Sequence, residues 1–183
     1  PMLIDAVGAL ADPAATPALL RWLAGERNVA VRLKLALALE KIPGDASGRA
    51  LVKLLSEEAE PLLGEHLCRI ASRRELPGAA ALLAALAEDV TAPMALRGQA
   101  VWALGRYPDS IAHQCLARLR RVPEKYFAAA PGPTTGSEPL EQARLLIALA
   151  SLRSGVPDAE KEVARRFTTG TPADQLMCLL SLA

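Results

Sequence analysis

A repeated segment constrains the fold of this chain more than any other feature. Residues 31–42 read VRLKLALALEKI and residues 96–107 read LRGQAVWALGRY, and a proline follows each segment at once. Self-similarity of this kind is the mark of a repeat protein, in which each unit buries its apolar face against the next unit. The sequence therefore predicts stacked copies of one small supersecondary unit.

The repeat can be followed along the whole chain from Leu39, the apolar residue near the end of the first segment. Equivalent positions fall at intervals of 29, 32, 33, 47 and 31 residues, at Leu10, Leu39, Ala71, Leu104, Ser151 and Leu182. The long interval contains residues 123–138, which are rich in Pro, Gly, Ala and Thr and show no helical periodicity. We therefore expect an insertion at 123–138, between two helices of one repeat.

Each repeat divides into two predicted helices. Apolar spacing predicts first helices over 13–25, 45–57, 76–88, 109–121 and 158–168, and second helices over 2–10, 28–42, 61–73, 93–106, 139–154 and 172–183. Four second helices begin with proline, which is tolerated in a first turn because its missing N–H would be unpaired there anyway. With 51% apolar residues but only 3% aromatic ones, the core must be built from Ala and Leu. The chain is expected to be all-α.

The pattern resembles the HEAT-repeat family, in particular its short phycobilisome-lyase-type repeats. Their second helix carries Val-Arg, two small residues and then Ala-Leu-Gly, and this chain matches it best at Leu96-Arg97, Ala100-Val101 and Ala103-Leu104-Gly105. The resemblance implies a right-handed α-solenoid of five to six two-helix repeats over residues 1–183, acting mostly as a scaffold. Both ends fall inside predicted helices, so we also expect a piece of a longer solenoid.

Arginines and aspartates recur at fixed places in the repeat. The arginines lie in second helices and the aspartates near the start of first helices, at Arg32, Arg97, Arg144 and at Asp12, Asp45, Asp109. In HEAT-like stacks such residues form a ladder between repeats, which is the interpretation favoured here over a role in binding.

The outward positions of the second helices predict where a partner binds. Large apolar or amphipathic residues occupy them, and the face becomes almost wholly apolar toward the C-terminal end; the candidates are Leu37, Arg69, Trp102, Leu145 and Leu149. Such a face predicts a covering segment or a protein partner. Tyr126 and Phe127 of the insertion either fold onto this face or reach a partner, and an error in helix register would also produce the pattern. The leading hypothesis is a non-enzymatic scaffold that binds a protein or peptide on its concave face.

A basic rim is the first alternative. Lys41, Arg73, Arg106 and Arg153 lie at the ends of second helices and would line one edge of a regular stack, as binding to a nucleic-acid backbone requires. Cations at helix ends also complement the helix dipole without any partner. The net charge of +1 gives no global attraction to nucleic acid.

A lyase-like enzyme on the same scaffold is the second alternative. It would need a pocket with two titratable groups within hydrogen-bond reach. His66 and His113 are the only histidines, and neither a glycine-rich phosphate loop nor a Ser, His and acid constellation is found. We expect no catalytic residue, no metal and no cofactor, with His66 facing solvent.

The cysteines bear on packing and on compartment. Cys68, Cys115 and Cys178 are odd in number, far apart and set among apolar residues, so they are expected to be buried as small hydrophobic side chains. Unpaired cysteines favour a reducing compartment, the cytoplasm. No apolar run reaches the about 18 residues that a membrane span needs.

Overall fold

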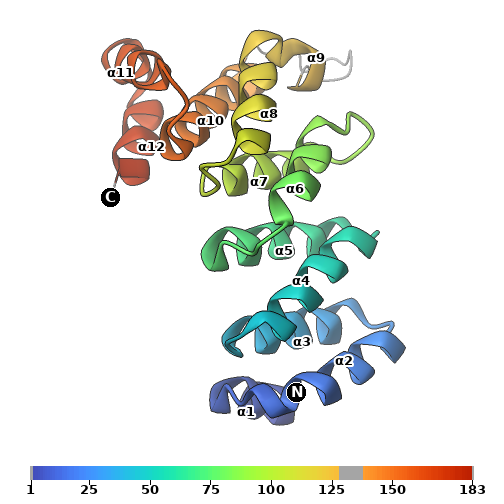
Figure 1. Ribbon diagram of the computed structural model, residues 1–183. Coiled ribbons are helices and arrows are strands. Elements are labelled where there is room, and N and C mark those ends of the chain that lie inside the picture. Colours follow the sequence, from blue (N-terminus) through green and yellow to red (C-terminus); the bar gives the residue numbers. More distant parts are fainter. Residues whose placement is uncertain (1, 128–137, 183) are drawn as a thin grey trace. The chain divides into compact units, whose positions relative to one another are not determined.

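The chain is all-α in this computed structural model, which describes residues 2–127 and 138–182 (Figure 1). The described residues contain helices and no strand, which confirms the predicted class. In chain order the helices are α1 (Met2–Leu10), the 3-10 helix η1 (Pro13–Ala15), α2 (Thr16–Gly25), α3 (Val29–Lys41), α4 (Asp45–Glu57), α5 (Pro61–Arg74), α6 (Ala79–Glu88), α7 (Met94–Leu104), α8 (Ser110–Arg121), α9 (Pro123–Phe127), α10 (Glu138–Ser154), α11 (Ala159–Thr169) and α12 (Pro172–Leu182).

Most predicted helix boundaries agree with the structure to within two residues. The α-helices α2 and α6 each begin three residues later than predicted, at Thr16 and Ala79, and the 3-10 helix η1 fills the difference before α2. Glu75 adopts a left-handed conformation at φ 48° and ends α5, and Gly78 follows at φ 83°. Two positive φ angles so close together need a turn, so the next helix cannot start at residue 76.

The predicted insertion contains a helix that its composition does not reveal. Residues 123–127 form α9, and Glu138 is already the first residue of α10. A five-residue helix is too short to show a 3.6-residue period, and Pro123 at its start suggested a break instead of a first turn. The Pro, Gly and Thr stretch at 131–137 lies outside the described residues.

The first 82 residues form one compact unit, Pro1–Leu82. Its second helices are neighbours in repeat order, because α3 packs against both α1 and α5 (Figure 1). The repeat positions Leu39 and Ala71 are fully buried in this unit. The equivalent residue of α1, Leu10, is 78% exposed.

The second unit, Leu83–Ala183, is built around α10. This helix packs against α7, α8, α9, α11 and α12. The repeat positions Leu104 and Ser151 are fully buried here. A helix with neighbours on so many sides has little surface left for solvent. The predicted partner residues Leu145 and Leu149 of this helix are buried as a result.

The recurring arginines do not pair with the recurring aspartates, so the predicted ladder is wrong. Asp12 and Asp109 are helix caps, accepting hydrogen bonds from the backbone N–H groups of Ala14 and Ala112. A carboxylate at a helix start finds backbone N–H groups close at hand, so it needs no distant arginine.

The arginines of α3 and α7 instead bind residues that come just after the next first helix in the chain. Arg32 pairs with Glu58, which follows α4, at 2.8 Å. Arg97, at the equivalent position, donates to the backbone carbonyl of Tyr126, which follows α8. A repeated Arg position thus holds the connection into the next second helix.

Close helix approach gives a test of the packing. A Cβ at Gly105, at the end of α7, would lie 3.0 Å from both the Cα and the carbonyl oxygen of Ala150 in α10. We expect Gly105→Ala to lower the free energy of unfolding by about 1–3 kcal/mol in urea titrations, because backbone atoms cannot move aside cheaply. Gly98→Ala is the matched control, since its nearest contact is an ordinary 3.5 Å to Leu146 Cδ2. It should be neutral or add up to about 1 kcal/mol through helix propensity; equal losses for the two variants would contradict this packing.

Candidate functional site

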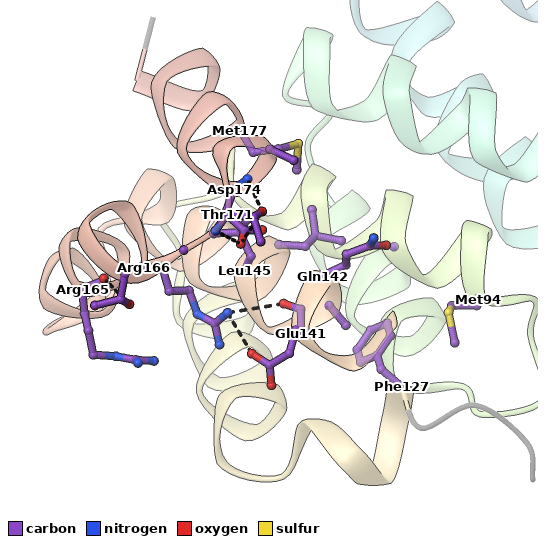
Figure 2. A pocket seen from close by; sticks show the side chains of 16 residues that line it. Met94, Phe127, Glu141, Gln142, Leu145, Arg165, Arg166, Thr171, Asp174 and Met177 are labelled. Carbon is purple, nitrogen blue, oxygen red and sulfur yellow. Dashed lines mark hydrogen bonds and ion pairs between the residues drawn. The ribbon is translucent and has the colours of Figure 1, made fainter. Parts of the chain in front are cut away.

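A cavity of about 820 Å³ lies within the second unit (Figure 2). We call it the apolar pocket. Its side chains come from α7, α9, α10, α11 and α12, and the apolar ones are Met94, Phe127, Ala143, Leu145, Leu146, Ala173 and Met177. Met94 and Phe127 lie on one side of the pocket, and Arg165 and Arg166 lie on the other (Figure 2).

The charged side of the apolar pocket is fixed by carboxylates. Arg166 has a side chain only 11% exposed and pairs with Glu162 through Nε at 2.7 Å. It also pairs with Glu141 through Nη1 at 3.1 Å (Figure 2). Arg165 also pairs with Glu162, at 2.8 Å. The hydrogen bond from Arg165 lowers the pKa of Glu162 below its usual value, and a hydrogen bond from Arg166 adds to this effect. Burial of the carboxyl group acts in the opposite direction. These partners leave Arg166 little freedom to turn toward a ligand.

The turn between α11 and α12 forms a rigid part of the pocket wall. Asp174 accepts hydrogen bonds from the Thr171 N–H at 2.9 Å and the Thr171 hydroxyl at 3.0 Å, and its own N–H donates to that hydroxyl at 3.3 Å. This is a reciprocal capping box. Gly170 packs so closely that a Cβ would lie 2.4 Å from the Arg166 carbonyl oxygen. Met177, in the next turn of α12, is thereby held at the pocket edge.

Two predicted partner residues on α10 are buried instead of outward-facing. Leu145 is 2% exposed and Leu149 0%, and both pack in one cluster with Val163 of α11 and Cys178 of α12. The prediction of an exposed face at these positions is therefore wrong, because α11 and α12 cover α10. Leu145 nevertheless contributes to the floor of the apolar pocket.

The other predicted second-helix residues keep part of their surface. Leu37, Arg69 and Trp102 are each half-buried. Arg69 forms an ion pair with Glu65 in the same helix at 3.9 Å. The Trp102 ring is partly covered by the guanidinium of Arg153, 4.3 Å from its centroid. Arg69 and Trp102 would both have to exchange these contacts for those of a partner.

The first five residues of the insertion, which form α9, pack within the second unit, and this decides between the two alternatives for its aromatic pair. Tyr126 is 9% exposed and Phe127 1%. Arg97 donates to the Tyr126 carbonyl and lies 5.2 Å from the centroid of the Phe127 ring. The prediction that these side chains reach out to a partner is therefore wrong, and Phe127 instead forms part of the pocket wall.

The candidate basic rim is only partly available for a phosphate backbone. Arg73 makes a two-pronged pair with Glu40 at 2.6 and 3.0 Å. Arg153 is half-buried beside Trp102, and burial, followed by the nearby charge of Arg106, lowers its pKa. Lys41 and Arg106 are exposed. Arg73 and Arg153 would therefore have to give up contacts within the protein in order to bind phosphates.

The described part of the chain shows no cluster of metal ligands, and its cysteines are buried. Across residues 2–127 and 138–182, no three His, Cys, Asp or Glu side chains are grouped as metal ligands would be. All three cysteines are buried, as predicted, and burial raises the pKa of Cys68 and of Cys115 to about 12. His66 is half-buried instead of solvent-facing, and burial followed by Arg69 lowers its pKa.

The apolar pocket meets the geometric condition set for a lyase-like enzyme, but with the wrong chemistry for proton transfer. Glu141 and Arg166 are titratable groups in contact, 3.1 Å apart. Arginine stays protonated in proteins, so this pair can supply charge but no general acid and base couple. The arrangement is suited to holding a ligand.

Comparisons with protein-family models, with curated proteins and with solved structures found no match for this chain. Within the described helices none is long and apolar enough to cross a membrane.

Burial of the aromatic pair predicts a structural role. We expect Tyr126→Ala with Phe127→Ala to lower the free energy of unfolding by at least about 3 kcal/mol, the usual cost of deleting a buried phenyl ring. Phe167→Ala is the control, because that ring is exposed; it should change stability by about 0.5 kcal/mol or less in the same urea titration. A double variant as stable as the wild type would show that the insertion does not pack as described.

The cysteine pKa values predict unreactive thiols. Because the thiolate is the reactive form, Cys68 and Cys115 should resist Ellman's reagent at pH 8 while the protein is folded. In guanidinium chloride all three cysteines of the chain should react. Rapid native labelling of either residue, located by mass spectrometry, would mean that its thiol is accessible.

Proposed function

We propose that this chain is a protein-binding scaffold, a right-handed α-solenoid of five to six HEAT-like two-helix repeats. Support comes from the order of neighbours within each unit. In the first unit α3 lies against α1 and α5, and in the second unit α10 lies against α7 and α12, so consecutive second helices pack side by side. This is how units of a solenoid share one core.

The apolar pocket is the proposed binding site for a partner protein. The main support for this proposal is that the interior of the pocket is apolar, while its buried cation, Arg166, is already paired with Glu141 and Glu162. A polar substrate needs polar groups that are free to bind it, whereas an apolar side chain gains about 1.5–3 kcal/mol simply by leaving water. The occupant is therefore a large apolar side chain of a partner, inserted as an anchor.

The surroundings of the apolar pocket favour a protein segment over a small molecule. Leu176 and Met177 of α12 and Met94 of α7 are large apolar side chains that remain exposed. An apolar edge extends the contact beyond a single buried side chain. Two flexible methionines at the edge can also adapt to different side-chain shapes. Leu37, Arg69 and Trp102 remain candidates for further contacts.

A selection from a displayed random-peptide library tests the proposal. We expect enriched peptides to carry an aromatic or large aliphatic anchor and to lose at least about ten-fold in affinity when Met94→Glu or Met177→Glu places a charge in the pocket. Met2→Glu is the matched control, because Met2 is exposed and does not line the pocket. Failure to enrich peptides, or equal losses with Met2→Glu, would contradict the assignment.

Nucleic-acid binding along the basic rim is the weaker alternative. Binding would require Arg73 to leave Glu40 and Arg153 to leave Trp102. It predicts an affinity that falls steeply with salt, whereas the capture of an apolar anchor should depend little on salt. Titration of a labelled oligonucleotide at two salt concentrations distinguishes the two.

A further inference from the structure

A second cavity in the same unit is lined largely by arginine. It measures about 280 Å³, and we call it the arginine pocket. Helices α8, α9, α10 and α11 contribute Arg120, Arg121, Pro123, Glu124, Arg144, Ile147, Ala148, Glu162, Arg165 and Arg166. Arg165 and Arg166 also line the apolar pocket, but the other residues are different.

Positive charge in the arginine pocket exceeds the negative charge available to neutralise it. Five arginines and two glutamates form its lining. Glu141, outside the lining, also pairs with Arg144 and Arg166. Asp158 also attracts Arg120, but its carboxylate already pairs with Lys161 at 2.6 Å. Five guanidinium groups therefore share three carboxylates that are not taken up by another cation, which leaves an excess of two positive charges.

Several N–H groups of the arginines that line this pocket also lack hydrogen-bond acceptors among the described residues. Arg121 is exposed and has no ion pair with another described residue, and Arg120 makes one hydrogen bond, to the Pro157 carbonyl at 3.3 Å. Arg144 pairs with Glu124, yet its buried Nε finds no partner among the described residues. The carboxylates therefore do not satisfy the guanidinium groups that surround them.

Helix dipoles do not explain the whole cluster. Arg120 and Arg121 lie in the last turn of α8 and Arg166 in the last turn of α11, where a cation is favoured without a ligand. Arg144 lies well inside α10, which runs from Glu138 to Ser154. Glu124 and Glu141 offset part of the repulsion that Arg144 meets in this small cavity, but its Nε still lacks an acceptor among the described residues. An anion would supply that acceptor.

We propose that the arginine pocket binds the terminal phosphate of a phosphate monoester. Such a group carries a charge of about −2 at neutral pH and offers three acceptor oxygens, which matches the charge excess and the forked donors of arginine. The cavity lies just below the about 300–1,000 Å³ typical of sites for whole small molecules, so it suits one anionic group. A nucleic-acid backbone, with one charge on each phosphate, would need a row of cations instead of a cluster.

Calorimetric titration of the full chain at pH 7.5 and constant ionic strength tests the proposal. The probes are inorganic phosphate, O-phosphoserine, a phosphoserine peptide, acetate and an oligothymidylate. We expect inorganic phosphate, O-phosphoserine and the phosphoserine peptide to bind at one site. Acetate should bind at least about ten-fold more weakly. A phosphopeptide that binds far better than O-phosphoserine identifies the source as a protein, whereas equal affinities identify a small phosphate ester. Equal binding of acetate, tighter binding of the oligothymidylate, or no binding would overturn the proposal.

Variants with opposite expected effects locate the site. Arg121→Gln should weaken phosphate binding by about ten-fold or more, because it removes a charged donor. Glu124→Gln should tighten binding, because it removes a carboxylate that competes for Arg144. Arg49→Gln, an exposed arginine of the first unit, is the matched control and should change nothing. Equal losses for Arg49→Gln and Arg121→Gln, or weaker binding after Glu124→Gln, would contradict this site.

This inference is independent of the proposed partner site. Met94 lines the apolar pocket but not the arginine pocket. Met94→Glu should therefore leave phosphate affinity unchanged while it weakens peptide binding, and either proposal can fail without the other.

Discussion

The second unit depends on the close packing of α10 with its neighbours. Small side chains make this packing possible: a Cβ at Gly105 would already meet the backbone of Ala150 at 3.0 Å. Five other helices contact α10, and its Ala143 and Ala148 are buried between them. Interiors packed to this density respond to single methylene groups, so the position of α10 is sharply defined. Both pockets take part of their lining from this helix, on residues 141–148.

Much of the fold is encoded in local patterns that one sequence makes visible. Apolar spacing, proline at first turns and the repeat period together place almost every helix, because these features act over a few residues. The missed helix, α9, has only five residues, which is too few for apolar side chains to recur on one face. The partners of Arg32 and Arg97 were missed for a different reason. A repeated charge shows that a position has one role in every repeat, but the group that pairs with it lies about a repeat length away in the chain.

The candidate site was harder to predict than the fold. Periodicity shows that Leu145 and Leu149 share a face of α10, but it does not show whether later helices cover that face. Here α11 and α12 do, through contacts with Val163 and Cys178. The part of the apolar face that stays open is the apolar pocket beside Leu146. A pattern within one helix could not predict this pocket, because side chains of five helices form its wall. The arginine pocket was missed likewise, since its residues are spread over 120–166.

The two arginines shared by the pockets differ in how firmly they are held. Arg166 is nearly buried and is bound to two carboxylates, Glu162 and Glu141, so moving it would leave charged groups unpaired in a partly desolvated place. Arg165 has a side chain 60% exposed and a single carboxylate partner, which water screens. The wall between the pockets is therefore made of one fixed and one adjustable cation. A phosphate in the arginine pocket can recruit Arg165 at small cost, whereas Arg166 keeps α10 and α11 together whether or not a ligand is bound.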